Sequence, residues 1–189
     1  MTGEAICGYL WATFLVVWLV SAFKTKPVEH REGVSSRLSY TVFVIAAFYL
    51  VFGKEVRPPW LRIHLFQPNR LSEVLGIALT AAGIGFAFWA RFYLGSNWSG
   101  TVTVKVGHQL VRTGPYRFVR HPIYTGMIVA LLGTALQKAQ VRGLIAVLLC
   151  YTGFKIKSKI EERAMAATFG PEYDQYSRGT GAIIPRVRF

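Results

Sequence analysis

The chain has 189 residues, of which 52% are hydrophobic and 16% charged, and its 22 Lys and Arg residues against nine Asp and Glu give a net charge of +13. Soluble domains carry about 25% charged residues, so this composition excludes an ordinary soluble protein, and its hydrophobicity excludes intrinsic disorder. A strongly basic chain can bind nucleic acid, but here the basic residues lie between long apolar runs. We therefore expect an integral membrane protein with no nucleic-acid partner.

Five apolar runs predict about five transmembrane helices and an all-α fold. The first three cover residues 5–23, 38–53 and 71–95, near the ~20 residues that cross a hydrocarbon core. The fourth and fifth, residues 122–136 and 143–154, are shorter, and the short connection between them predicts an antiparallel hairpin. Small residues in the third run predict close helix packing: Gly76, Ala78, Ala81, Ala82, Gly83 and Gly85.

The basic residues outside these runs are unevenly distributed. When alternate connecting segments are grouped, fifteen Lys and Arg residues fall on one face of the membrane and six on the other. Cytoplasmic loops of membrane proteins carry an excess of Lys and Arg. We therefore expect the N-terminus outside and the C-terminus in the cytoplasm, with the excess positive charge facing anionic membrane lipids.

A polar segment at residues 97–124 precedes the fourth run and reads NWSGTVTVKVGHQLVRTGPYRFVRHPIY. Its residues 101–106 alternate β-branched side chains and could form a short strand. Pro122 disfavours a helical conformation for His121, so Arg120 and His121 should lie at the mouth of the fourth run. Ionisable residues at the edge of hydrocarbon are costly unless they are paired or functional. Alternatively, the arginine is only a headgroup anchor and the histidine only caps the helix.

A second polar cluster stands where the fifth run ends. If the helix continues, Lys157 and Glu161 share a face, and Glu162 lies about 100° away, beside Lys155 and Lys159. The cluster could be a solvated helix end of mixed charge. However, its two glutamates are the only adjacent acidic residues in the chain. They should emerge on the same face as the polar segment before the fourth run, and a carboxylate in a basic setting is suited to holding a cationic group.

Two motifs, GHQLVRTGPYRFVRHPIYTG at residues 107–126 and EERAMAATFGPEYDQY at 161–176, together resemble the isoprenylcysteine carboxyl methyltransferase family. More broadly, they resemble the small membrane methyltransferases that include phospholipid N-methyltransferases. The resemblance covers residues 90–185, which we call the methyltransferase motif region. We expect a single membrane domain over residues 1–189, in which residues 1–70 form N-terminal spans and loops. The resemblance implies an enzyme that binds S-adenosylmethionine through a cytoplasmic loop and a C-terminal helical tail.

The resemblance also implies roles for individual residues. A substrate-facing arginine of the family aligns with Lys157, which keeps the charge but loses the bidentate fork, and Arg91 is a second substrate-binding candidate. The candidate catalytic residues are Arg120, which would orient an anionic substrate head, and Glu162, which (or else His121) would accept a proton. No metal site is expected. By position, the family's cofactor contacts fall on His108, Gln109, Leu110, Val111, Tyr116, His121, Pro122, Tyr124 and Glu161.

The methyl acceptor stays open at this point. A lipophilic substrate entering from the bilayer could offer an isoprenylcysteine carboxylate, and the alternatives are a phospholipid amine or a small thiol. NADPH-dependent sterol reductases are similar in the stretch Arg-His-Pro-x-Tyr that ends at Tyr124. However, they usually have Asn at the position of Ile123 and a cysteine-containing segment instead of the acidic pair. A non-catalytic membrane adaptor would explain the apolar runs but not two polar clusters.

Overall fold

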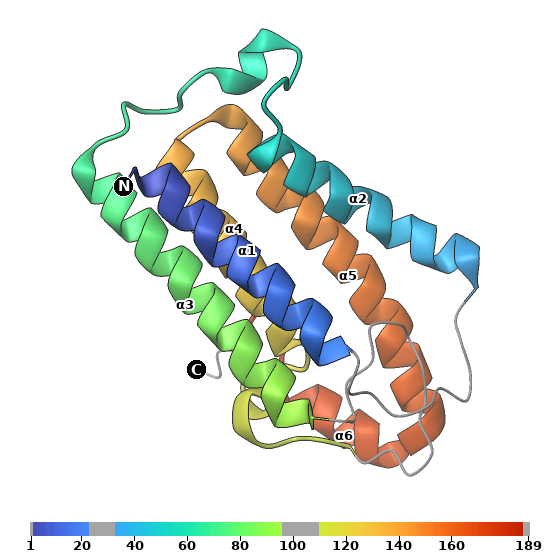
Figure 1. Ribbon diagram of the computed structural model, residues 1–189. Coiled ribbons are helices and arrows are strands. Elements are labelled where there is room, and N and C mark those ends of the chain that lie inside the picture. Colours follow the sequence, from blue (N-terminus) through green and yellow to red (C-terminus); the bar gives the residue numbers. More distant parts are fainter. Residues whose placement is uncertain (1, 23–32, 96–109, 187–189) are drawn as a thin grey trace.

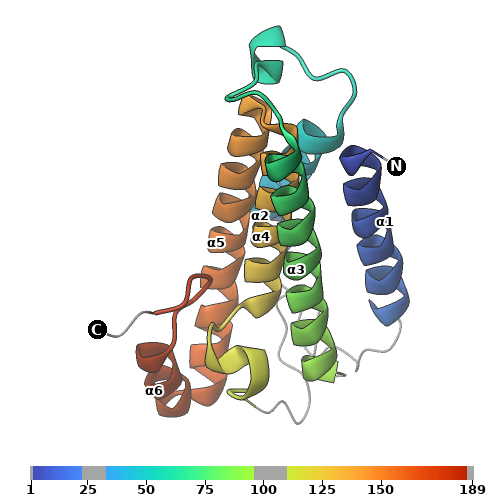
Figure 2. The same ribbon diagram turned by 90° about the vertical axis from the view of Figure 1, so that its left-hand side faces the viewer.

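The computed structural model describes residues 2–22, 33–95 and 110–186, and within these ranges every long element is a helix. Helices α1 to α5 run side by side with alternating direction, and the short α6 lies at one end of the bundle (Figures 1 and 2). This confirms the predicted all-α class. The helices are α1 (Gly3–Ala22), α2 (Val34–Phe52), α3 (Arg70–Leu94), α4 (Pro122–Lys138), α5 (Val141–Phe169) and α6 (Pro171–Gly179), with short 3-10 turns at Pro59–Arg62 and Gly114–Arg117.

Each predicted apolar run overlaps one of the five long helices. Among the described residues, α1, α2 and α3 are long and apolar enough to cross a membrane. Helix α4 has only 17 residues, and α5, with 29, joins an apolar first half to a charged second half. Membrane crossing by these last two helices therefore stays a prediction.

Local sequence explains where α3 and α4 begin. Asn69 caps α3, because its side chain accepts a hydrogen bond from the Ser72 amide at 2.9 Å while the Ser72 hydroxyl accepts one from the Asn69 amide at 3.1 Å. Pro122 occupies the first turn of α4, where its missing N–H costs no hydrogen bond. His121 directly before it is non-helical, with φ −123° and ψ 62°, as predicted.

Helices α3 and α4 approach so closely that two pairs of glycines replace side-chain packing. A Cβ added at Gly133 would stand 2.6 Å from the Gly76 carbonyl oxygen, and one at Gly126 would stand 2.6 Å from that of Gly83. Such small-residue contacts bring helix backbones together in membranes. Of the small residues predicted to pack, only Gly76 and Gly83 are buried, and Gly85 faces open space.

The core between α1, α3 and α4 contains a buried polar network. The Trp11 indole N–H donates to the Thr134 hydroxyl at 2.9 Å, and the Thr80 and Thr134 hydroxyls lie 3.2 Å apart. Cys7 and Cys150 are both buried, and neither forms a disulfide. The network satisfies polar atoms that would otherwise be stranded in an apolar interior.

Two connections bring the polar clusters together. Helices α4 and α5 form the predicted antiparallel hairpin through Ala139, which adopts the left-handed conformation at φ 52°. Hence the start of α4 lies beside the second half of α5 (Figure 2). After α6 the chain returns to this point, where the Gly181 carbonyl accepts from the Arg120 amide at 2.8 Å and the Ala182 carbonyl from the His121 amide at 2.9 Å.

Candidate active site

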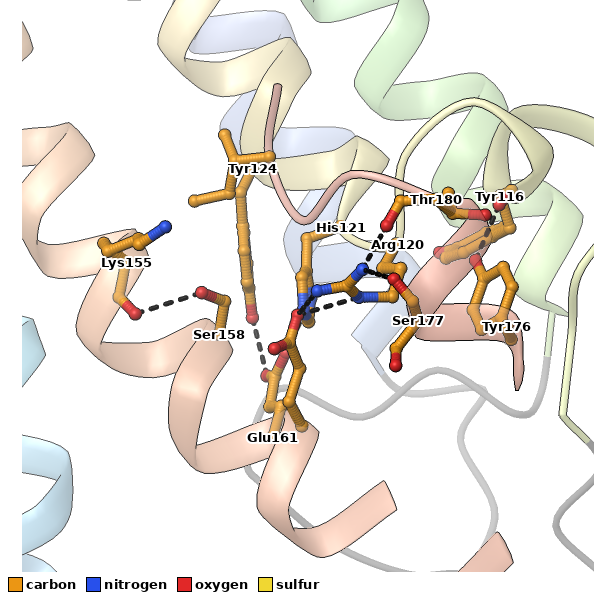
Figure 3. Close-up of polar contacts among 12 residues, drawn as sticks. Tyr116, Arg120, His121, Tyr124, Lys155, Ser158, Glu161, Tyr176, Ser177 and Thr180 are labelled. Atoms are coloured by element: carbon orange, nitrogen blue, oxygen red, sulfur yellow. Dashed lines mark hydrogen bonds and ion pairs between the residues drawn. The ribbon is translucent and has the colours of Figure 1, made fainter. Parts of the chain in front are cut away.

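His121 lies between the two adjacent glutamates of α5. Its Nδ1 is 3.3 Å from Oε2 of Glu161, and its Nε2 is 3.1 Å from Oε1 of Glu162. Figure 3 shows the imidazole entering from the start of α4 and the carboxylate of Glu161 rising toward it from α5. The three side chains are only 10%, 18% and 24% exposed, respectively. Residues some 40 positions apart in sequence therefore form one partly enclosed ionisable cluster.

The charges in this cluster stabilise one another. Burial alone would lower the pKa of His121, but hydrogen bonds to Glu161 and Glu162 and their negative charges outweigh it, so the pKa is raised. Burial would raise the pKa of both carboxyls, but the bonds to His121, together with the charge of Lys157 on Glu161 and of Arg120 on Glu162, lower both pKa values. The site therefore favours an imidazolium between two carboxylates.

Arg120 is held on two sides. Its Nε and Nη2 lie 3.0 Å and 2.8 Å from Oε1 of Glu162. Its Nη1 donates to the backbone carbonyl of Ser177 at 2.8 Å and also to that of Thr180 (Figure 3). The guanidinium thus ties α5 to the C-terminal segment. In this arrangement it serves to fix Glu162 beside the imidazole.

The side-chain partners of Glu162 come from outside its own helix. Lys155 and Lys159 precede Glu162 on α5 and are exposed, whereas the ion pairs of Glu162 are with Arg120 and His121. Ion pairs are stronger when they are shielded from water, and the guanidinium offers two donors to the carboxylate. A pattern of residues along one helix does not reveal partners that come from another helix.

Glu161 is bound by its predicted partner and by a tyrosine. Lys157, four residues earlier, has its Nζ 3.9 Å from Oε1 of Glu161, so the predicted shared face is confirmed. The Tyr124 hydroxyl donates to the same oxygen at 2.6 Å. The Tyr124 ring is nearly parallel to the His121 ring at 5.4 Å between centroids and to the Phe154 ring at 4.6 Å. The carboxylate is therefore set against a row of aromatic rings.

Other predicted cofactor contacts lie near the cluster. Tyr116 is buried, donates its hydroxyl to the Ala90 carbonyl at 3.4 Å, and packs in an apolar group that includes Ile123 and Val111. Its own carbonyl accepts from the Tyr176 hydroxyl at 2.6 Å, and burial raises the pKa of Tyr176 to about 12. These residues form an apolar wall beside the polar cluster.

The remaining candidate residues lie outside the cluster around His121 or outside the described residues. Arg91 is 3% exposed and donates to the backbone carbonyls of Gly95 at 3.0 Å and Ser21 at 2.6 Å, so it joins the ends of α3 and α1. Pro122 is buried at the start of α4 and Leu110 is half-buried. His108, Gln109 and the possible strand at 101–106 lie outside the described residues.

Some parts of the site were not predicted from the sequence. The carbonyls of Ser177 and Thr180 carry no sequence signal, because any residue can supply a carbonyl. Tyr173 and Tyr176 are both buried and lie three residues apart on one face of α6, a spacing that could have indicated packing against the site. The ammonium of Lys157 lies over the ring of Tyr40 in α2. Nothing in the apolar run around Tyr40 distinguishes it from the other core residues.

The arrangement is similar to that of known proteins. A model of the phospholipid methyltransferase family matches residues 71–172. Protein-S-isoprenylcysteine O-methyltransferase of Saccharomyces cerevisiae is 30% identical over 133 residues, covering 68% of this chain and 56% of that protein. Methanethiol S-methyltransferase 1 of Bradyrhizobium diazoefficiens is 27% identical over 177 residues, covering 86% of this chain and 56% of that protein. The solved eukaryotic intramembrane Ras methyltransferase, an isoprenylcysteine carboxyl methyltransferase, aligns with a TM-score of 0.59 at 27% identity, over 78% of this chain and 52% of that one.

The chain spans just over half the length of each of these three relatives. The family model covers more than half of the 189 residues and includes both polar clusters. This agrees with the resemblance found in the two sequence motifs. The chain therefore belongs to the phospholipid methyltransferase family.

Proposed function

We propose that the chain is an S-adenosylmethionine-dependent methyltransferase of the membrane, acting on a lipophilic acceptor that enters from the bilayer. One observation carries the proposal. The two polar clusters meet as one partly enclosed group around His121, at the end of an apolar bundle. Ionisable groups with perturbed pKa values concentrate at functional sites, and this cluster holds three of them.

The chemistry of these residues fits S-adenosylmethionine. Its ammonium and ribose hydroxyls suit the carboxylate of Glu161, which is 18% exposed. Its adenine suits an apolar and aromatic wall such as the one formed by Val111, Tyr116 and Ile123. When bound, the cofactor supplies a methyl group already activated by a positive sulfur. The protein then has to hold and orient both reactants, an effect that can contribute roughly 7–11 kcal/mol.

The ionisable residues of this site are poorly suited to accepting a proton from a substrate. His121 has a carboxylate oxygen within 3.3 Å of each ring nitrogen and a raised pKa, so it is better suited to donating hydrogen bonds to the glutamates than to accepting a proton. Glu162 has a lowered pKa and is therefore a weak base. These properties favour an acceptor that is already anionic. We infer an isoprenylcysteine-like carboxylate, with Lys157 as its cationic partner.

A small thiol is the second candidate acceptor. The similarity to a methanethiol S-methyltransferase covers more of this chain than the similarity to the yeast isoprenylcysteine enzyme. A lysine at position 157, where the isoprenylcysteine family has an arginine, also weakens the case for a carboxylate. Family membership gives no support to the NADPH-dependent reductase or to the adaptor.

We further propose that all five long helices cross the membrane in a single domain, with the cluster on the cytoplasmic side. The N-terminus of α1 and the end of α5 lie at opposite ends of the bundle (Figure 1), as five crossings require. The excess of basic residues at the cluster's end supports a cytoplasmic C-terminus.

Titration calorimetry of the detergent-solubilised chain tests this function. We expect S-adenosylmethionine to bind with measurable heat and NADPH to give none. Lys159→Gln, which changes an exposed residue of α5, should bind the cofactor as wild type does. Binding of NADPH without binding of S-adenosylmethionine would refute the proposal.

A further inference from the structure

The ammonium of Lys157 lies in an unusual setting. Its Nζ is 5.2 Å from the centroid of the Tyr40 ring, 5.5 Å from that of Tyr124, and 3.9 Å from a carboxylate oxygen of Glu161. The side chain is only 13% exposed. A lysine at a membrane edge usually extends its charge into water. Here the charge is folded back onto two aromatic rings and a carboxylate.

The packing of three helices sets this geometry. Tyr40 is buried in α2, which contacts α5 closely at Gly153; a Cβ there would stand 3.0 Å from the Tyr40 carbonyl oxygen. Tyr124 of α4 is oriented by the hydrogen bond from its hydroxyl to Glu161. The two rings and the carboxylate are therefore fixed by separate helices rather than by Lys157 itself.

This group of side chains matches the recognition of an onium group. Cations within about 6 Å of a tyrosine ring centroid are attracted by its negative face, and aromatic cages bind methylated ammonium ligands in this way. A sulfonium has no N–H to donate, so it is attracted by charge rather than by hydrogen bonds, and both the negative faces of aromatic rings and a nearby carboxylate supply that attraction. We propose that Tyr40, Tyr124 and Glu161 form a cage for an onium group, and that Lys157 fills the cage until such a ligand displaces it.

The inference rests on the proposed function and adds a ligand class to its site. The onium group has two possible sources, the sulfonium of the methyl donor and the ammonium of a lipid headgroup. In either case the displaced ammonium of Lys157 becomes available to an anionic acceptor, which is the role predicted for it. The two sources can be distinguished by binding experiments.

The first arm compares S-adenosylmethionine with S-adenosylhomocysteine, which lacks the sulfonium charge, by calorimetry of the full chain in detergent. Tyr40→Leu should reduce the preference for S-adenosylmethionine by about three- to thirtyfold, the range expected for one cation–π contact. Tyr40→Phe keeps a ring face and should retain the preference. Phe48→Leu removes a ring from the same helix away from Lys157 and should also retain it.

The second arm titrates short-chain phosphatidylethanolamine against short-chain phosphatidylglycerol on the same variants. Loss of preference in Tyr40→Leu in either arm supports the cage and identifies the source. In the arm that responds, Lys157→Met should strengthen binding of the onium ligand, while Lys159→Met should not. If Tyr40→Leu keeps both preferences, the cage is refuted, even where wild-type binding of S-adenosylmethionine upholds the proposed function. If wild type fails to bind S-adenosylmethionine, that function fails and the lipid arm alone decides the cage.

Discussion

At the scale of single residues, the two adjacent glutamates have different surroundings. Glu162 is bound on one oxygen by both Arg120 and His121, whereas Glu161 contacts His121, Tyr124 and the ammonium of Lys157. We therefore propose that Glu162 mainly holds Arg120 and His121 in position. Glu161 faces the aromatic rings, where a cationic ligand would come within its reach.

This difference predicts unequal effects of two matched substitutions. Glu161→Gln should weaken binding of S-adenosylmethionine by roughly tenfold or more, because a charge-assisted contact contributes about 1.5–3 kcal/mol. Glu162→Gln should weaken binding far less and instead lower the thermal unfolding midpoint, because it leaves the partly buried Arg120 without its carboxylate. Calorimetry and thermal unfolding in detergent measure both effects. Equal losses of affinity in the two variants would contradict the roles assigned here.

The ionisable cluster also predicts how stability depends on pH. The raised pKa of His121 means that its contribution is complete below about pH 6.5 and is lost as the pH rises through the raised value. The lowered pKa values of Glu161 and Glu162 mean that their contributions are complete above about pH 4.3 and are lost as the pH falls through the lowered values.

Thermal unfolding of the solubilised chain should therefore give its highest midpoints between about pH 4.3 and 6.5, with a decline on the alkaline side. His121→Asn should remove that alkaline decline. His64→Asn, which changes an exposed histidine at the other end of the bundle, should keep it. The same pH profile in both variants would show that His121 does not cause the alkaline decline.

At the scale of helices, the contact between α3 and α4 fixes where the site forms. Gly76 and Gly83 are seven residues apart, as are Gly126 and Gly133 on the partner helix, and the antiparallel pairing joins the first of one pair to the last of the other. This contact holds α4 in place, and His121 directly precedes α4. The close contact between α3 and α4 therefore helps to fix the position of the His121 imidazole.

Two neighbouring glycines of α3 provide a matched test of this contact. Gly83→Ala should lower stability by about 1–3 kcal/mol, because the added Cβ would overlap the backbone of α4. Gly85→Ala meets nothing within 4 Å and should be neutral or stabilising by up to about 1 kcal/mol, since alanine favours a helix. Thermal unfolding of both variants checks the difference. Similar midpoints for the two variants would show that the close approach does not contribute to stability.

The sequence predicted the helices better than it predicted which side chains pair between them. The five apolar runs predicted the five long helices, because the length and hydrophobicity of a run depend only on consecutive residues. The shared face of Lys157 and Glu161 was predicted for the same reason, since both lie on one helix. The pairing of Glu162 with Arg120 was missed, because it depends on how α4, α5 and the C-terminal segment pack.

At the scale of the whole molecule, the chain separates an apolar bundle from a charged end. The cluster around His121 and helix α6 lie at one end, and the segment between α2 and α3 lies at the other (Figures 1 and 2). Among the described residues outside the predicted apolar runs, most Lys and Arg residues lie in the segments at the cluster's end, 110–121 and 155–186. This asymmetry predicts the orientation in the membrane.

Single cysteines can test that orientation, because Cys7 and Cys150 are buried and should react little. An impermeant maleimide applied to intact cells should label Gln67→Cys, at the end away from the cluster. It should label Gln175→Cys, on α6, only after lysis. Both positions are exposed in the structure. The opposite pattern of labelling would place the cluster outside the cell.

The cluster around His121 is proposed to bind the donor of a methyl transfer. The most direct measurement is transfer of a labelled methyl group from S-adenosylmethionine to total membrane lipids and an added S-prenylcysteine by the purified chain in liposomes, followed by identification of the labelled species. We expect label in an organic-extractable product with wild type and with Glu172→Gln, which alters an exposed ion pair with Arg112. We expect at least a tenfold loss with Glu161→Gln at limiting donor. Equal labelling by wild type and Glu161→Gln, or no labelling of any lipophilic species by wild type, would contradict the account.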